Sequence, residues 1–305
     1  MTDISIKNRI TAIAAYIAAA SVLTLQYHQP TAIVYFFAVG LVLLFADKLF
    51  DRTKVTCPTA TAFAVSVLCH QTFFQIFYKT HDSIKQLLTA LAVAVFLAGV
   101  FALADGKKQW ISVAAAPIIS LADYRIAFCY CILTLSFSVV KLLSAEKAKT
   151  KSSLKSKKKS SSVKPSLSDN KLLIISAAVS ALCMLFCIFP AVKDTGNTVE
   201  AIRYFLVNFK NTPFILTACV YLLVRLLKGD IRAKAGIITG FALNVISAVV
   251  FCILYGWTML SFFLISGLLF CALNCLENSQ IADSVKADYD NHRYLFSALI
   301  LCMFI

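Results

Sequence analysis

Charged residues are scarce in this 305-residue chain: they make up 14% of it, and hydrophobic residues make up 60%. A typical soluble domain carries about a quarter charged residues. With so few charges the chain cannot cover its apolar surface in water, so the composition excludes an ordinary soluble domain. Because one spanning helix needs about 20 apolar residues, the composition predicts an all-α fold, a polytopic bundle of transmembrane helices.

The sequence also lacks the motifs of common catalytic sites. No apolar segment carries a pair of carboxylates, and the four histidines form no HExxH motif. Neither a phosphate-binding GxxxxGK[ST] sequence nor a GxSxG nucleophile motif occurs. We therefore predict no catalytic residue, and a protein that is not an enzyme is the first hypothesis.

The eleven cysteines do not indicate a disulfide framework, because their number is odd and nearly all lie inside apolar segments. Cys183 and Cys187 are four residues apart and share a helix face, as do Cys271 and Cys275. A soft metal ion can bind such a pair, but neither pair has a histidine or carboxylate beside it. We therefore predict no metal site and no cofactor.

Acidic residues are few as well, 15 against 29 lysines and arginines. Ten lysines but only two acids fall between Lys141 and Lys171, so this stretch contributes +8 of the net charge of +14. Its lysines and serines predict a disordered cytoplasmic linker over residues 144–171, held near anionic lipid headgroups. Basic residues concentrated in inner loops follow the positive-inside rule, so we expect membrane lipids as partners and no nucleic acid.

Eleven apolar segments, with a range of 10 to 12, are bounded by charges, prolines and turn residues. They cover residues 10–26, 31–46, 57–78, 87–104, 110–122, 126–143, 172–192, 213–227, 235–255, 257–276 and 294–305. If the N-terminus is cytoplasmic, 23 lysines and arginines lie on the inner side and 6 on the outer side. This bias predicts a multi-pass cell-membrane protein with that orientation, and we expect the membrane to be a bacterial plasma membrane.

The spans form two predicted domains around the linker, a first bundle of about six spans over residues 1–143 and a second of about five over 172–305. Segment 110–122 is short and contains Pro117, so both a full span and a re-entrant segment stay open. The last segment is also short, and we expect the natural chain to continue beyond Ile305.

Two of the predicted spans share a short sequence. Residues 61–67 and 239–245 are identical at four of seven positions, which suggests a repeat related by an axis along the membrane normal. In the second copy small residues recur every four positions around one amide, Asn244. Gly236, Gly240 and Ala248 form this stripe, which predicts a close helix-packing face.

The densest polar group inside a predicted span is His70 with Gln71 and Gln75. Polar groups at membrane depth are costly and tend to face a cavity or a partner helix. We therefore take these three, with Ser66 and Asn244, as candidates for a substrate pathway. For His70 three roles stay open: a structural hydrogen bond, a substrate contact and proton coupling.

Six spans, a basic inner linker and a second set of spans resemble the plan of the major facilitator transporters. Asp47, Lys48, Asp51, Arg52 and Lys54 are similar to the charged loop that the family has between its second and third helices. Phe50 stands where the family has a turn glycine, and a twelfth helix is missing, so the resemblance is one of architecture.

The first functional hypothesis is a permease or flippase-like transporter of a neutral, amphiphilic or lipid-linked cargo, because the spans contain few charges. The second is a membrane-embedded transferase or polymerase of envelope glycans or lipids that uses outer residues between Asp194 and Lys210. Residues 199–210 also show the spacing of an amphipathic interfacial helix. The third hypothesis is a non-transporting membrane assembly partner.

Overall fold

A computed structural model describes residue 21 and residues 83–105, 109–154, 167–191, 212–229, 234–255, 260–292 and 294–295. Every regular element in these ranges is an α-helix, so the predicted all-α fold is confirmed. The helices are α5 (Ser83–Asp105), α6 (Gln109–Ala122), α7 (Tyr124–Leu154), α8 (Leu167–Ala191), α10 (Thr212–Lys228), α11 (Lys234–Tyr255), α12 (Leu260–Glu277) and α13 (Ser279–Asn291).

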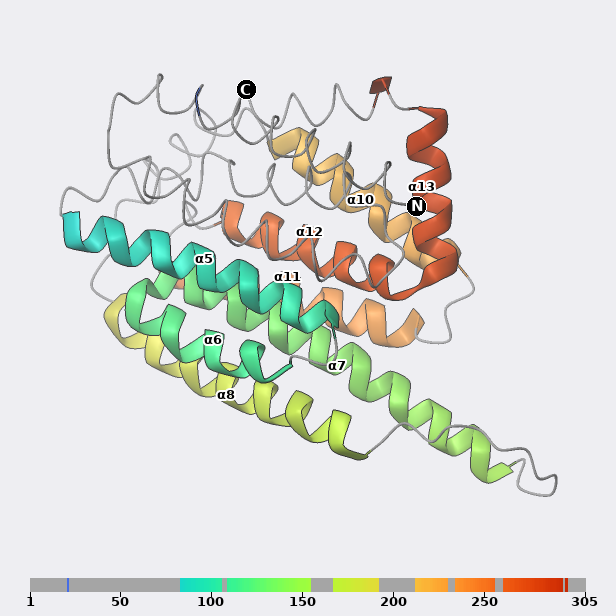
Figure 1. Cartoon of the computed structure of the whole chain (residues 1–305), viewed down its shortest axis with the longest axis horizontal. Helices are drawn as coiled ribbons and strands as arrows, with labels where there is room; N and C mark the ends of the chain where they lie inside the picture. The colour runs from blue at the N-terminus through green and yellow to red at the C-terminus, as the bar shows by residue number, and fades with distance from the viewer. Residues whose placement is uncertain are drawn as a thin grey trace, which may run out of the picture.

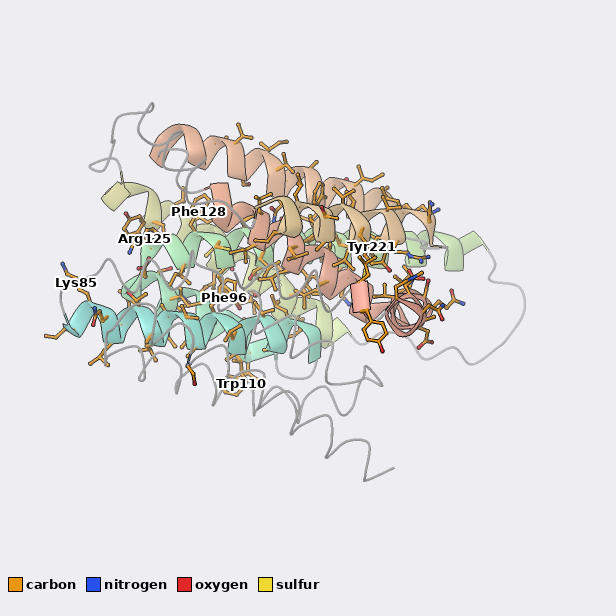
Figure 2. The ribbon with its side chains drawn as sticks, turned by 90° about the horizontal axis from the view of Figure 1, so that it is seen from above. Lys85, Phe96, Trp110, Arg125, Phe128 and Tyr221 are labelled. Carbon is orange, nitrogen blue, oxygen red and sulfur yellow. The ribbon has the colours of Figure 1, made fainter. Side chains whose placement is uncertain are left out.

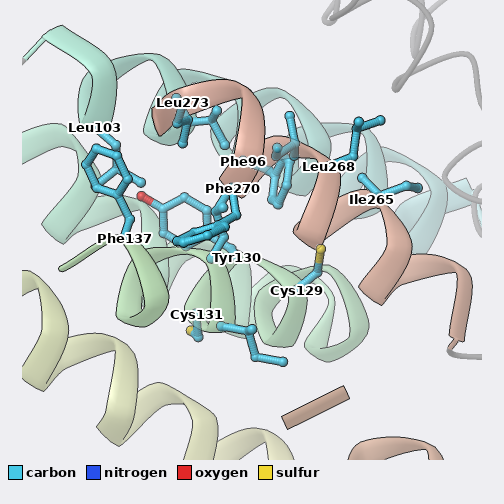
Figure 3. Close-up of a cluster of buried hydrophobic side chains, with 14 of the residues drawn as sticks. Phe96, Leu103, Cys129, Tyr130, Cys131, Phe137, Ile265, Leu268, Phe270 and Leu273 are labelled. Atoms are coloured by element: carbon cyan, nitrogen blue, oxygen red, sulfur yellow. The ribbon is translucent and has the colours of Figure 1, made fainter. Parts of the chain in front are cut away.

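Helix α7 is the centre of the described bundle and packs against α5, α6, α8, α11 and α12. Its residues Ile126–Leu133 are all buried, because apolar or small side chains occupy every face of this part of the helix. Around it a cluster of large side chains from α5, α7 and α12 forms the core (Figure 3). Within it the rings of Phe96 and Tyr130 meet edge to face at a centroid distance of 5.7 Å.

Successive long helices run in alternating directions, as Figure 1 shows. Side-chain contacts fix two of the parallel pairs. Ser112 and Ser120 of α6 meet Ser176 and Cys187 of α8 in the same order along both helices. Cys219 and Leu222 of α10 meet Cys271 and Cys275 of α12 in the same way. Figure 1 shows the end of α7, the start of α8 and the ends of α10 and α12 at one end of the bundle.

Helix α13 lies across that end, roughly perpendicular to the other helices (Figure 1). Only Asn278 separates it from α12. The side chain of Asn278 caps α13 by accepting a hydrogen bond from the backbone N–H of Ile281 at 3.4 Å. Ile281 is buried and Val285 packs against the core, so these two residues, four apart, attach the helix to the bundle. This helix was not predicted from the apolar segments.

The ends of the predicted linker differ from the prediction of disorder. Helix α7 continues to Leu154 and α8 begins at Leu167, so residues 144–154 and 167–171 are helical. Alanine, lysine and glutamate in the first stretch all favour helix, and they extend a helix already nucleated by the packed half of α7. Helices from both predicted domains, α7 with α11 and α12, also share one core.

Only part of the predicted membrane topology is visible. In the described residues one helix, over Tyr124–Leu143, is long and apolar enough to cross a membrane. Of this apolar stretch, 72% is buried inside the bundle. Helices α5, α6, α8, α11 and α12 carry shorter apolar stretches, so the eleven predicted spans are not established. Segments 31–46 and 57–78 and the predicted interfacial helix at 199–210 lie outside the described residues, as do segment 10–26 except residue 21 and segment 294–305 except residues 294 and 295.

Candidate functional site

Helix α8 turns a face of serines and cysteines toward the bundle and a face of large apolar side chains outward. Ser176 and Ser180 are buried, as are Cys183 and Cys187. The opposite face is exposed and aliphatic or aromatic, and comprises Ile174, Ile175, Leu182, Leu185 and Phe186. A surface helix of a soluble protein shows the reverse arrangement, with its polar face in water.

Helix α11 also exposes large aliphatic side chains, while small residues and one amide lie on its buried face. Its buried face holds Gly236, Gly240 and Asn244 with Ile237. Its exposed face holds the large aliphatic residues Ile238, Val245, Ile246, Val249 and Val250. On α6, Trp110 also points away from the bundle and is 62% exposed (Figure 2).

Small polar side chains gather where α6, α7 and α8 meet, and we call this group the hydroxyl seam. Contacts place Ser112, Cys131, Ser176, Ser180, Cys183 and Cys187 there, and Thr134 and Ser138 follow Cys131 at helical spacing on the same face of α7; all eight are buried. The hydroxyl oxygens of Ser112 and Ser176 are 3.3 Å apart, and Ser112 also donates to the carbonyl oxygen of Gln109 at 2.7 Å. Tyr130 donates to the carbonyl oxygen of Ser112 at 3.0 Å. These bonds tie the three helices together at one end of the seam.

The seam extends over several helical turns toward the other end of the bundle. There the Cys187 thiol lies 3.9 Å from the Ser120 hydroxyl, which donates to the carbonyl oxygen of Ala116. Ser112 and Ser120 are eight residues apart, which corresponds to about 12 Å along a helix. The seam therefore runs along the helices rather than forming one isolated contact.

Some buried polar atoms in and beside the seam have no hydrogen-bond partner among the described residues. They include the hydroxyl of Ser138 and the side-chain oxygen of Gln109, and also the hydroxyl of Ser136 on the α11 side of α7. Thr134, by contrast, donates to the carbonyl oxygen of Tyr130, the usual way for a helical hydroxyl to be satisfied. A buried polar group without a partner costs about 1–3 kcal/mol, so these groups are candidates for contact with a polar ligand.

The described interior carries hardly any charge. Apart from Asp123, its buried polar residues are serine, threonine, asparagine and glutamine. Asp123 lies at the start of α7, where its carboxylate accepts hydrogen bonds from the backbone N–H and the guanidinium of Arg125 at 2.9 and 2.8 Å. It therefore caps the helix and forms an ion pair there, and it does not offer a free charge to the seam.

The predicted pathway residues fall into two groups. His70, Gln71, Gln75 and Ser66 lie outside the described residues. Asn244 is 2% exposed, and its amide donates to the hydroxyl of Ser266 on α12 at 2.8 Å. Asn244 thus links α11 to α12.

The stripe of small residues on α11 faces α7. A Cβ atom on Gly240 would lie 2.9 Å from the backbone oxygen of Ser136 and 2.8 Å from Val140, so the two helices touch closely there. On Gly236 a Cβ atom would lie 3.5 Å from the backbone of Val140. Ala248 lies one turn after Asn244 on the same helix, and its side chain is outside the described set.

Sequence reasoning missed the hydroxyl seam. Ser176, Ser180, Cys183 and Cys187 follow the spacing of one helix face, and this signal was available in the sequence. The corresponding residues of α6 and α7 could not be assigned to the same place, because their helices meet α8 only in the folded chain.

Thiols accompany the buried hydroxyls, and some of these thiols contact one another. Cys131 on α7 is close enough to Cys183 and Cys187 to interact with both, and Cys219 on α10 contacts Cys271 on α12. The described residues nevertheless contain no group of three metal-ligating side chains arranged to hold an ion.

Comparisons with protein-family models, with curated proteins and with solved structures found no match.

Proposed function

We propose that this chain is a multi-pass integral membrane protein that moves a neutral, amphiphilic or lipid-linked cargo across the bilayer as a permease or flippase. The observation that carries the proposal is the arrangement of α8 and α11: both expose large aliphatic side chains, while the buried face of α8 carries serines and cysteines and that of α11 carries glycines with Asn244. In water these exposed faces would cost free energy, whereas in lipid they are solvated and the buried hydroxyls need internal partners.

The dimensions of α7 support the same proposal. Its apolar part, Tyr124–Leu143, has 20 residues, which is about 30 Å of helix and matches the hydrocarbon core of a bilayer. The remaining residues to Leu154 carry lysines into the cytoplasm under the proposed orientation. There they attract anionic headgroups, at about 1 kcal/mol per lysine near the membrane surface.

A neutral cargo follows from the chemistry of the seam. Serine and threonine hydroxyls donate and accept hydrogen bonds but carry no charge to balance an ion. The hydroxyl of Ser138 and the side-chain oxygen of Gln109, which have no partner in the described part of the chain, supply this capacity. A lipid or lipid-linked molecule with a hydroxyl-bearing headgroup fits these groups.

The test is a lipid-flipping assay on the purified full chain in liposomes. The probe is a fluorescent lipid with a neutral sugar headgroup, and dithionite destroys the fluorophores that reach the outer leaflet. We expect dithionite to remove more of the fluorescence from proteoliposomes than from empty liposomes. Equal loss in both preparations, together with no uptake of a neutral amphiphilic solute, would contradict the proposal.

Two hydroxyl variants connect the activity to the seam. Ser138→Ala removes a buried hydroxyl, and Thr239→Val removes one from the exposed face of α11, where it donates to the carbonyl oxygen of Ala235 at 2.8 Å. We expect the flipping rate to fall severalfold with Ser138→Ala and to stay unchanged with Thr239→Val. An unchanged rate in both variants would exclude the seam as the pathway.

Replacing His70 and Asp194 separately distinguishes the proposal from the other hypotheses. Loss of transport with His70→Ala supports a pathway through the third span. Loss of a glycan or lipid product with Asp194→Asn supports a transferase. If neither change alters any activity, the result favours the hypothesis of a non-transporting assembly partner.

A further inference from the structure

We propose that α13 is a releasable latch on the inner ends of α10 and α12, and that Asp288 is the residue that holds it closed. This inference concerns regulation and rests on the proposed membrane function only for the side on which the latch lies. Because α13 lies at the same end of the bundle as the lysine-rich end of α7, the predicted orientation makes that side cytoplasmic.

Asp288 joins α13 to α10 through two hydrogen bonds to one carboxylate oxygen. The hydroxyl of Tyr221 donates to it at 2.5 Å, and the guanidinium of Arg225 donates to it and forms an ion pair. The Arg225 guanidinium also lies 5.7 Å from the centre of the Tyr221 ring, so these three side chains form one cluster. Figure 2 shows Tyr221 beside α13.

The same helix makes an apolar contact with the end of α10. Ile281 is 5% exposed, and a Cβ atom on Gly229 would lie 2.7 Å from its terminal methyl group. The fit of Ile281 against a residue without a side chain sets the distance between α13 and α10. An apolar contact and a charged cluster therefore attach the helix at two separate points.

The charged cluster is partly open to solvent, which makes the latch releasable. The side chains of Arg225 and Asp288 keep 34% and 25% of their surface exposed. An ion pair with this exposure is far weaker than a buried one, and water or another charged group can replace either partner. Water does not reach the buried contact of Ile281 in this way.

Three thiols lie at the contact between α10 and α12, the two helices that α13 joins. Cys219, Cys271 and Cys275 are at most 5% exposed, and the Cys275 sulfur lies 3.9 Å from the carbonyl oxygen of Leu222. If α13 releases, the inner ends of α10 and α12 can separate and these thiols become accessible. The native chain thus contains its own reporters of the open state.

The experiment measures alkylation by N-ethylmaleimide on the purified full chain in lipid nanodiscs, read at each cysteine by peptide mass spectrometry. We expect Asp288→Asn to increase the alkylation rate of Cys275 roughly tenfold, because the cluster loses its charged acceptor. Tyr221→Phe keeps the ring and removes one donor, so its increase is smaller, about threefold. Asp283→Asn, an exposed acid on the same helix, is the matched control and leaves the rate unchanged.

Cys131 separates latch release from general loosening. It is fully buried on α7, against α8 and away from α13, and it should stay unreactive in every variant. An unchanged Cys275 rate in Asp288→Asn, or Cys131 alkylated in parallel with Cys275, would overturn the latch. If the Asp288→Asn protein does not accumulate, the same two criteria, the alkylation rates of Cys275 and Cys131, are applied to Tyr221→Phe. Alkylation requires no transport, so either result leaves the flipping assay to judge the proposed function independently.

Discussion

Two glycines of α11 lie one turn apart and make different contacts with α7. At Gly240 an added Cβ atom would meet the backbone oxygen of Ser136 at 2.9 Å, and backbone cannot move aside cheaply. At Gly236 the nearest atom would be 3.5 Å away, an ordinary contact distance. The four-residue spacing in the sequence predicts the same close packing at both positions. Only the contact with α7 shows that Gly240 is packed more tightly than Gly236.

We therefore expect Gly240→Ala to lower the free energy of unfolding by about 1–3 kcal/mol through overpacking. Gly236→Ala is the matched control and should be neutral or stabilising by up to about 1 kcal/mol, since alanine favours helix over glycine. Thermal unfolding of both variants in detergent, followed by the loss of the monodisperse peak in gel filtration, measures the difference. Equal melting temperatures would show that α11 does not approach α7 closely at Gly240.

At the scale of helices, the apolar segments predicted most of the described elements. The segment predicted at 110–122 corresponds to α6, Gln109–Ala122, because charges and Asp123 bound it on both sides. Pro117 lies inside this helix and does not end it. Helix α13 was missed because its moderate amphipathicity rests on Ile281 and Val285 within a polar sequence, a pattern that long apolar segments do not detect.

The parallel pairing of α6 with α8 can be tested by a disulfide across the basic segment. The hydroxyl oxygens of Ser112 and Ser176 are 3.3 Å apart, so cysteines there can form a disulfide with little movement. In a chain with a specific protease site inserted at residue 160, Ser112→Cys with Ser176→Cys should keep both fragments joined until reductant is added.

The control pair for this test is Ser112→Cys with Ile175→Cys. Ile175 lies on the exposed face of α8 and is 47% exposed, so its cysteine points away from α6. The fragments of this control should separate on a gel without reductant. Equal cross-linking of both pairs would mean that α8 does not hold one fixed face toward α6.

For the whole molecule, the decisive property is the solvent that the exposed faces meet. Leu182 lies near the middle of α8 and is 58% exposed, and Leu172 lies beside Lys171 near its start and is 37% exposed. In lipid, an arginine at the centre of a spanning helix costs roughly 3 kcal/mol. An arginine near the helix end can extend its guanidinium to the headgroups at a much smaller cost.

We therefore expect Leu182→Arg to reduce the yield of membrane-inserted, monodisperse protein severalfold, and Leu172→Arg to leave the yield nearly unchanged. Quantitative fluorescence of a fused reporter in membrane fractions measures both. In water the outcome would differ, because an exposed arginine at position 182 would be tolerated and would improve solubility. Equal yields for the two variants would therefore contradict lipid contact along α8.

The sequence by itself determined the all-α class and the main apolar segments, because composition and charge position act locally along the chain. It also indicated the close-packing stripe of α11 before any partner helix was known. Only the tertiary structure decided that α7 lies at the centre, that serines from three helices form one seam, and that Asp288 meets Tyr221 and Arg225. The hydrogen bonds among these residues join positions 63 to 67 apart in the sequence. They depend on which faces of the helices meet in the folded chain, and no local sequence pattern specifies that.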